Sequence, residues 1–253
     1  FKKVCVRIFL LAYSLLAFSA HSKEKIAVAF GDALAPWVLP ASNSGILVDI
    51  VKEALEPLGY AITLEYYPYL RRLNSFRANQ VDVVSDINVK TLKAENLTGY
   101  LVENVYAYEN YAFSLHENNF QFKHISELSN YSLLSWQGAI THLGGDYAKM
   151  AKSNPNYVET HNQLAQLKML FRKRVQVIQL DDKIFNYYRL QLINEKQEIG
   201  LAKIDKFALL GPSPNGFLFK SEKVKNDFLE QITLMKQDGR YDAIVNKYAP
   251  VID

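Results

Sequence analysis

Cysteine is almost absent from this sequence, because Cys5 is the only one among 253 residues. The chain therefore cannot form an intrachain disulfide, and beyond residue 22 it offers no thiolate as a nucleophile or metal ligand. Histidines do not compensate, since no two of them share the spacing of a zinc-binding motif. We expect no metal site and no cofactor. The lack of thiols is compatible with an oxidising compartment.

Long apolar runs are also missing, apart from one near the start. Residues 8–18 are mainly apolar, follow three basic residues and precede small residues, which is the layout of a secretory signal peptide. The run is about half as long as a membrane-spanning helix needs. We expect cleavage after Ser22, with Ser19 or Ala20 as alternatives, and export of the remaining chain to the periplasm.

The sequence has no excess of charge of one sign beyond this leader. Lys2, Lys3 and Arg7 account for the formal net charge of +3, and without them 26 basic residues stand against 26 acidic ones. No stripe of lysine and arginine remains to favour nucleic acid or an anionic membrane as a partner. We therefore expect neither.

What the sequence does contain is an alternation of strand-like and helix-like segments. Apolar positions recur at helical spacing between residues 47 and 58, and Gly59 supplies a left-handed stop. Strands are expected at 26–30, 62–66 and 81–84, and a short helix at 69–78. The order β-α-β-α-β is typical of a parallel sheet with helices on both faces, whose ligands lie beyond the carboxyl ends of the strands.

A second unit of the same kind begins near Glu109. Its strands are expected at residues 111–115, 132–135 and 175–180. Its helices are expected to begin near Gly138 and to span residues 162–171. After a breaker-rich segment, a strand is expected at 217–219, followed by two helices that end at Gly239 and Pro250. No polar linker separates the units. We therefore expect the chain to cross to the second unit and return to complete the first.

Four segments carry a family resemblance. Residues 45–50 resemble a Gly-apolar-x-apolar-Asp-apolar helix entry, and residues 79–84 resemble a Gly-x-apolar-Asp strand, with Asn79 or Gln80 where glycine is usual. Residues 173–178 with Asp181, and residues 236–248, resemble two later motifs. In this order, the four segments resemble the small extracellular solute-binding proteins, family 3, which include polar amino acid receptors of bacterial ABC transporters.

This resemblance implies a two-lobed α/β fold of the periplasmic-binding-protein type (type II), in which each lobe is a sheet flanked by helices. Residues 1–22 would be the signal peptide, 23–108 with 212–253 a discontinuous first lobe, and 109–211 the second. Two crossover strands would act as a hinge, crossing near residues 106–110 and returning near 207–212, so that closure traps a ligand.

Two candidate ligand contacts lie in the first lobe. Trp37 follows the first strand, where the family places an aromatic over the ligand, although packing alone also explains it. Arg71 lies in a segment resembling a Pro-Trp-x-Arg motif, and its guanidinium suits a carboxylate or phosphate. The neighbouring Arg72 and Arg77 favour a solvated basic helix face as the alternative.

The family's usual carboxylate-binding arginine is missing. Asn96 stands where it is expected, and an amide lacks both the charge and the fork geometry for that role. This departure argues against an α-amino acid as the ligand. Lys90 or Lys93 could act as point charges instead, or could simply be solvated.

The second lobe supplies the other candidates. Gly138 and Thr141 fit a strand-to-helix turn that offers backbone N–H groups to an anionic part of the ligand. Trp136 could close over the ligand or lie in the core. Asp181 corresponds to the family's ligand-facing acid, which binds an ammonium group, but it could also cap the following helix.

The sequence therefore predicts a monomeric periplasmic receptor for a small polar ligand, with no catalytic residues and with an ABC permease or a membrane sensor as its partner. One alternative is an enzyme resembling the cyclohexadienyl dehydratases of the same fold, which would need an acid or base beside cationic groups. Another is a ligand-sensing module for a signalling receptor.

Overall fold

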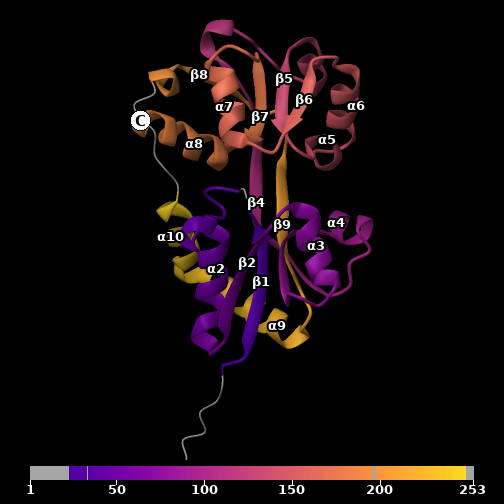
Figure 1. Ribbon diagram of the computed structural model, residues 1–253, viewed down its shortest axis with the longest axis vertical. Coiled ribbons are helices and arrows are strands. Elements are labelled where there is room, and N and C mark those ends of the chain that lie inside the picture. The colour runs from indigo at the N-terminus through magenta and orange to yellow at the C-terminus, as the bar shows by residue number, and fades with distance from the viewer. Residues whose placement is uncertain (1–22, 33, 196–197, 249–253) are drawn as a thin grey trace, which may run out of the picture.

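The computed structural model describes residues 23–32, 34–195 and 198–248. The predicted signal peptide and the predicted stop at Pro250 lie outside these residues. The described strands form one nine-stranded sheet with the order β2-β1-β3-β9-β4-β7-β5-β6, and β8 pairs with β4. Figure 1 shows two groups of strands, each flanked by helices, with β4 and β9 running between them. None of the described helices has the length and apolar character needed to cross a membrane.

The first group is built around β1 (Lys25–Gly31). Strands β2 (Ala61–Tyr67) and β3 (Val83–Ile87) run parallel to it, and β9 (Pro212–Phe219) runs antiparallel to β3. Successive side chains of a strand point to opposite faces, so β1 contributes to two cores. Phe30 packs in the cluster that includes α2 (Ile46–Leu55), whereas Ala29 packs with α3 (Tyr69–Arg77).

In the second group, one strand, β4, runs antiparallel to the four others that the structure describes. Strands β5 (Leu133–Trp136), β6 (Tyr157–Thr160) and β7 (Val177–Asp181) are parallel, while β7 and β8 (Ile204–Phe207) run antiparallel to β4. Helices α7 (Gln163–Phe171) and α8 (Asp182–Asn194) cover one face, and α5 (Ala139–His142) and α6 (Gly145–Ser153) cover the other.

The remaining helices are short or terminal. They are α4 (Val89–Ala94), α9 (Glu222–Asp238) and α10 (Arg240–Lys247), with 3-10 turns η2 (Pro40–Ser42), η3 (Glu56–Leu58), η4 (His116–Asn118), η5 (Ile125–Asn130) and η6 (Glu198–Leu201). Side chains cap several helix starts, because Asn88, Asn162 and Ser221 accept hydrogen bonds from the first turns of α4, α7 and α9. Such caps satisfy backbone donors that a helix leaves unpaired.

Strand β4 (Tyr100–Leu115) links the two groups. Its last pairing with β9 is Glu109 opposite Pro212, and its first pairing with β7 is Asn110 opposite Asp181. The change of partner therefore falls between two consecutive residues. It lies inside the range expected for the first crossing, while the exact lobe bounds of 108/109 and 211/212 stay a prediction.

The fold class predicted from the sequence is confirmed: the chain is an α/β protein with two lobes. Within the described residues, the expected strands and helices all occur, with shifted ends. Pattern reading missed α4, α6, β6 and β8, and it expected α8 only as the helix that Asp181 could cap. Strand β6 is only four residues long and leaves Val158 59% exposed, so it has no clear apolar alternation to reveal it.

Gly216 provides a test of the contact between β4 and β9. A Cβ atom at this position would lie 1.8 Å from the carbonyl oxygen of Val102 in β4. We expect Gly216→Ala to force the two strands apart and to lower the free energy of unfolding by about 3 kcal/mol or more. Urea denaturation measures this loss.

Gly211 is the matched control for this substitution. It lies just before β9, and a Cβ atom there would meet no atom within 4 Å. Gly211→Ala should change stability by no more than about 0.5 kcal/mol. Equal effects of the two substitutions would contradict the close approach of the strands.

Candidate functional site

Several direct contacts join the described residues of the two lobes, and three of them define a common zone. The indole of Trp37 donates to Asp181 at 2.9 Å, the rings of Tyr69 and His142 meet edge to face at 5.5 Å, and Lys90 donates to the carbonyl of Thr141 at 3.3 Å. Asp181 is the last residue of a strand, and the other residues follow the carboxyl ends of strands in the two groups. Ligands of open α/β sheets bind at such ends, so this contact zone is the candidate site.

Trp37 and Asp181 form the deepest of these contacts. Trp37 is 2% exposed and packs against the rings of Tyr106 and Tyr108 at 5.5 and 5.0 Å. Lys183 lies 5.8 Å from the indole ring. Two readings of Trp37 were possible from the sequence, and in the structure its indole is packed within the protein while its N–H reaches the second lobe.

Both oxygens of the Asp181 carboxylate accept hydrogen bonds. Besides Trp37, the backbone N–H of Ile184 donates at 3.1 Å, so that Asp181 caps α8, and the backbone N–H of Glu109 donates at 2.9 Å. Burial raises the pKa of Asp181 to about 6, against the opposing effect of these three donors and of Lys183. Asp181 thus has the capping role that the sequence left open as an alternative.

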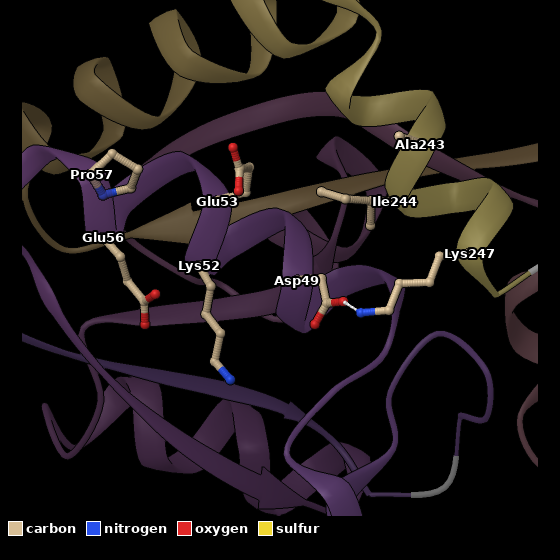
Figure 2. A pocket seen from close by; sticks show the side chains of 8 residues that line it. All are labelled: Asp49, Lys52, Glu53, Glu56, Pro57, Ala243, Ile244 and Lys247. Carbon is tan, nitrogen blue, oxygen red and sulfur yellow. Dashed lines mark hydrogen bonds and ion pairs between the residues drawn. The ribbon is translucent and has the colours of Figure 1, made fainter.

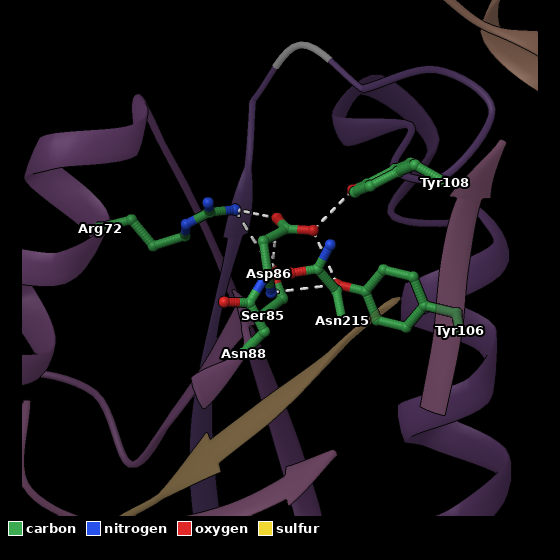
Figure 3. A network of polar contacts seen from close by, with 7 residues as sticks. All are labelled: Arg72, Ser85, Asp86, Asn88, Tyr106, Tyr108 and Asn215. Carbon is green, nitrogen blue, oxygen red and sulfur yellow. Dashed lines mark hydrogen bonds and ion pairs between the residues drawn. The ribbon is translucent and has the colours of Figure 1, made fainter. Parts of the chain in front are cut away.

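A second buried charge lies in the first lobe (Figure 3). Asp86, at the end of β3, forms an ion pair with Arg72 of α3 and accepts hydrogen bonds from the hydroxyls of Tyr106 at 2.7 Å and Tyr108 at 2.5 Å. Ser85 donates to the same carboxylate at 3.2 Å. We call these five residues the Arg72–Asp86 cluster.

The charges in this cluster support each other. Burial acts to raise the pKa of Asp86, but the Arg72 guanidinium and the two tyrosine hydroxyls hold it below its ordinary value. Burial likewise opposes the charge on Arg72, and the Asp86 carboxylate raises the arginine pKa overall. The pair is therefore ionised at neutral pH. Asp86 also has a left-handed backbone, with φ of 61°, at an irregularity in the pairing of β3 with β9.

Arg71, a predicted ligand contact, takes part in none of the contacts between the lobes described above. It is exposed, and its guanidinium lies 4.9 Å from the ring centre of Tyr67. Arg72, which the alternative interpretation of the sequence placed on a solvated basic face, is 3% exposed. The arginine next to the predicted one is thus the residue that the fold buries beside the candidate site.

The predicted turn after β5 is present, but its donors are occupied. Glu159 of β6 accepts the backbone N–H groups of Gly138 and Ile140, each at 2.8 Å. Trp136 is half-buried and stacks on His142 at 5.9 Å, and Thr141 is exposed. The turn therefore already holds a carboxylate, and that carboxylate belongs to the protein.

The remaining polar candidates lie at the surface. Asn96 and Lys93 are exposed, and Lys90 donates a hydrogen bond to the carbonyl of Thr141, as described above. Among the described residues, no group of three or more His, Cys, Asp or Glu side chains could hold a metal ion.

A groove of about 470 Å³ lies on another surface, between α2, η3 and α10 (Figure 2). Its lining includes Asp49, which accepts a hydrogen bond from Lys247 at 2.8 Å, and the apolar Ile244. None of its lining residues takes part in the three contacts between the lobes. The groove is separate from the candidate site.

Asp181 should make the free energy of unfolding depend on pH. Its folded-state pKa of about 6 exceeds the ordinary value of 3.8, so between these values the folded protein holds a proton that the unfolded chain has released. Relative to Asp181→Asn, the wild type should gain up to about 3 kcal/mol of stability as the pH falls from 7 to 4, and should lose it as the pH rises through 6.

Urea denaturation of both proteins at each pH measures this difference. Asp182→Asn removes a neighbouring, partly exposed carboxylate that pairs with Lys206 at 2.8 Å, and it controls for the loss of a charge at the start of α8. A constant difference between the wild type and Asp181→Asn across this pH range would show that Asp181 is not held in a desolvated site.

A comparison of the sequence with protein-family models found no match, and neither did a comparison with curated proteins. Solved structures do match. A histidine kinase sensor domain with similarity to periplasmic binding proteins has a TM-score of 0.70 at 13% identity, covering 92% of this chain and 99% of that one.

Two binding proteins match over similar lengths. The substrate-binding protein of an amino acid ABC transporter has a TM-score of 0.62 at 16% identity, covering 88% of this chain and 98% of that one. An ancestral amino acid-binding protein, described as a precursor of cyclohexadienyl dehydratase, has a TM-score of 0.63 at 17% identity, covering 89% and 96%. The chain has the two-lobed fold of the periplasmic binding proteins.

Proposed function

We propose that this protein is an exported solute-binding protein that captures a small polar ligand, an amino acid or another small charged metabolite, between its lobes. The supporting observation is a line of side chains that spans both lobes at the strand ends. Arg72 lies 5.5 Å from the ring of Tyr69, Tyr69 meets His142, and His142 stacks on Trp136. Charged and aromatic side chains that converge between two lobes suit the capture of a ligand by lobe closure.

The contacts across this zone are of a kind that closure and opening can make and break. They consist of individual hydrogen bonds and ring contacts between loop and helix-end residues. The chain passes between the two groups of strands through β4 and β9, so a change at residues 109–110 and near residue 212 can move one lobe against the other.

The hydrogen bonds of the two buried carboxylates, Asp86 and Asp181, support binding without catalysis. Asp86 accepts two hydrogen bonds on each oxygen and Asp181 accepts three in all, so most of the acceptor capacity of both carboxylates is used within the protein. We therefore place the protein among the receptors rather than with the dehydratases to which one structural neighbour is ancestral.

The matching structures favour an extracytoplasmic location and a membrane-bound partner. Because they include both a transporter's binding protein and a kinase sensor domain, an ABC permease and a membrane sensor both fit this fold. We propose the permease as the partner, with a monomeric receptor that delivers its ligand after opening.

Ligand-dependent stabilisation tests the proposal. The exported form would be unfolded and refolded to remove bound solute, then melted with amino acids, small carboxylates, amines, sugars and peptides. A true ligand at about 100 times its Kd adds about 2.7 kcal/mol, which raises the melting temperature by roughly 5 to 10 °C.

Two neighbouring residues provide the matched variants. Tyr69→Ala removes a ring from the contact between the lobes and should reduce the shift, whereas Leu70→Ala alters a side chain that is 65% exposed and should leave it unchanged. Consumption of a prephenate-like acid would favour the enzyme instead. No shift with any solute would contradict the receptor function.

A further inference from the structure

Arg72 is unusually deeply buried for an arginine whose nitrogens do not all have hydrogen-bond partners. Its side chain is 3% exposed and lies on the face of α3 that also carries Leu73 and Phe76, which are fully buried. Arginine is rarely buried unless its donors are paired, because desolvation penalises a charge that lacks partners. The pairing of each guanidinium nitrogen is therefore informative.

One terminal nitrogen of Arg72 makes all of its hydrogen bonds. Nη1 donates to the Asp86 carboxylate and, at 3.2 Å, to the hydroxyl of Ser85. Asp86 in turn is fixed by Tyr106 and Tyr108. The guanidinium is thus held in one orientation, as Figure 3 shows, with its interactions drawn from a single nitrogen.

The opposite edge of the guanidinium is unused. Nε is buried and has no hydrogen-bond partner, and Nη2 makes no hydrogen bond within the described residues. Nε–H and Nη2–H point in the same direction and form the side-on fork that binds two oxygens of one carboxylate. The guanidinium carbon lies 5.5 Å from the ring centre of Tyr69, and no hydrogen bond joins these two described residues.

Two other arginines in the same chain show how this edge is normally filled. Arg189 directs Nε and Nη2 at the carbonyl oxygens of Gly200 and Ala202, at 2.9 and 3.1 Å. Arg240 directs the same two nitrogens at Asp238, at 2.9 and 2.8 Å. Both are less buried than Arg72, so the empty fork occurs where an unpaired donor is most costly.

We propose that the side-on edge of Arg72 binds the carboxylate of the captured solute. This inference rests on the proposed function and adds to it a ligand class, small carboxylates, and a residue that holds them. Asp86 is then a positioning residue, because it occupies Nη1 and leaves Nε and Nη2 directed at the ligand.

The second lobe supports this placement, because its own anion site is filled. Glu159 already accepts the N–H groups of Gly138 and Ile140, so those donors are not free for a ligand carboxylate. Asn96, where the sequence resemblance expects an arginine, is exposed and has no fork. Arg72 supplies from α3 the fork that position 96 lacks.

Acetate is the simplest probe of the site. In ¹H–¹⁵N spectra of the exported form, the Arg72 Nε–H signal can be assigned by its loss in Arg72→Lys. Sodium acetate should shift this signal in a saturable way, while sodium chloride at equal ionic strength should not. If acetate shifts no arginine Nε–H signal beyond the response to chloride, the proposal is overturned, and this result needs neither the assignment nor a folded variant.

Arg72→Lys separates anion binding from the ion pair. Lysine keeps a charge for Asp86 but has no side-on fork, so a carboxylate ligand should bind about 10- to 100-fold more weakly. Arg71→Lys makes the same change at the exposed neighbour and should have no effect. Each amino acid that stabilises the protein is compared with its C-terminal amide. The amide should bind the wild type as weakly as the free amino acid binds Arg72→Lys.

The outcomes distinguish the two proposals. If a solute binds equally well as acid and amide, and equally well to Arg72→Lys, the receptor function stands and the role of Arg72 is wrong. If acetate shifts the Arg72 signal but no solute stabilises the protein, the anion site stands and the receptor function is wrong. If neither occurs, both are wrong.

Discussion

The Asp181 carboxylate ties together three parts of the chain that are distant in sequence. Its donors are the indole of Trp37 after β1, the backbone of Glu109 where β4 changes partner, and the backbone of Ile184 at the start of α8. A buried carboxylate is stable only while such donors remain in place. Because Trp37 belongs to one lobe and α8 to the other, any separation of the lobes must break the indole bond or move the helix. Asp181 therefore links the mutual position of the lobes to the strand that crosses between them.

The strand that crosses between the lobes is held on both sides of its change of partner. Asn110 accepts from the side chain of Gln179 at 2.9 Å and donates to Ser213 at 3.2 Å, so it links β4 to both β7 and β9. Pairing with β9 continues back from Glu109 to Tyr106, and pairing with β7 continues from Asn110 to Phe113. Under the proposed function, a bending motion would fall at the residues around 109 and 110 and near 212, next to the Asp181 acceptor. Hinge and lobe contact are coupled because they share this carboxylate.

Sequence patterns were sufficient for the fold but insufficient for the site, and α3 shows why. Tyr69, Arg72, Leu73 and Phe76 share one helical face, so helical spacing would have placed Arg72 inside and Arg71 outside. The motif resemblance pointed to Arg71 instead. Asp86 follows an expected strand, and that position could have indicated it. By contrast, the link between Glu159 and the turn at Gly138 depends on the pairing of β5 with β6, and a strand as short as β6 leaves no pattern from which to infer it.

The two lobes differ in how they present charge. In the second lobe, Glu159 satisfies the turn donors from within, and this fixes the turn before any ligand arrives. In the first lobe, Asp86 satisfies only one nitrogen of Arg72 and leaves a rigid, desolvated fork. A fixed donor pair that is already desolvated binds an anion without the cost of reorganising itself. Under the two proposals, charge recognition would fall to the first lobe, and closure would add the rings of His142 and Trp136 from the second.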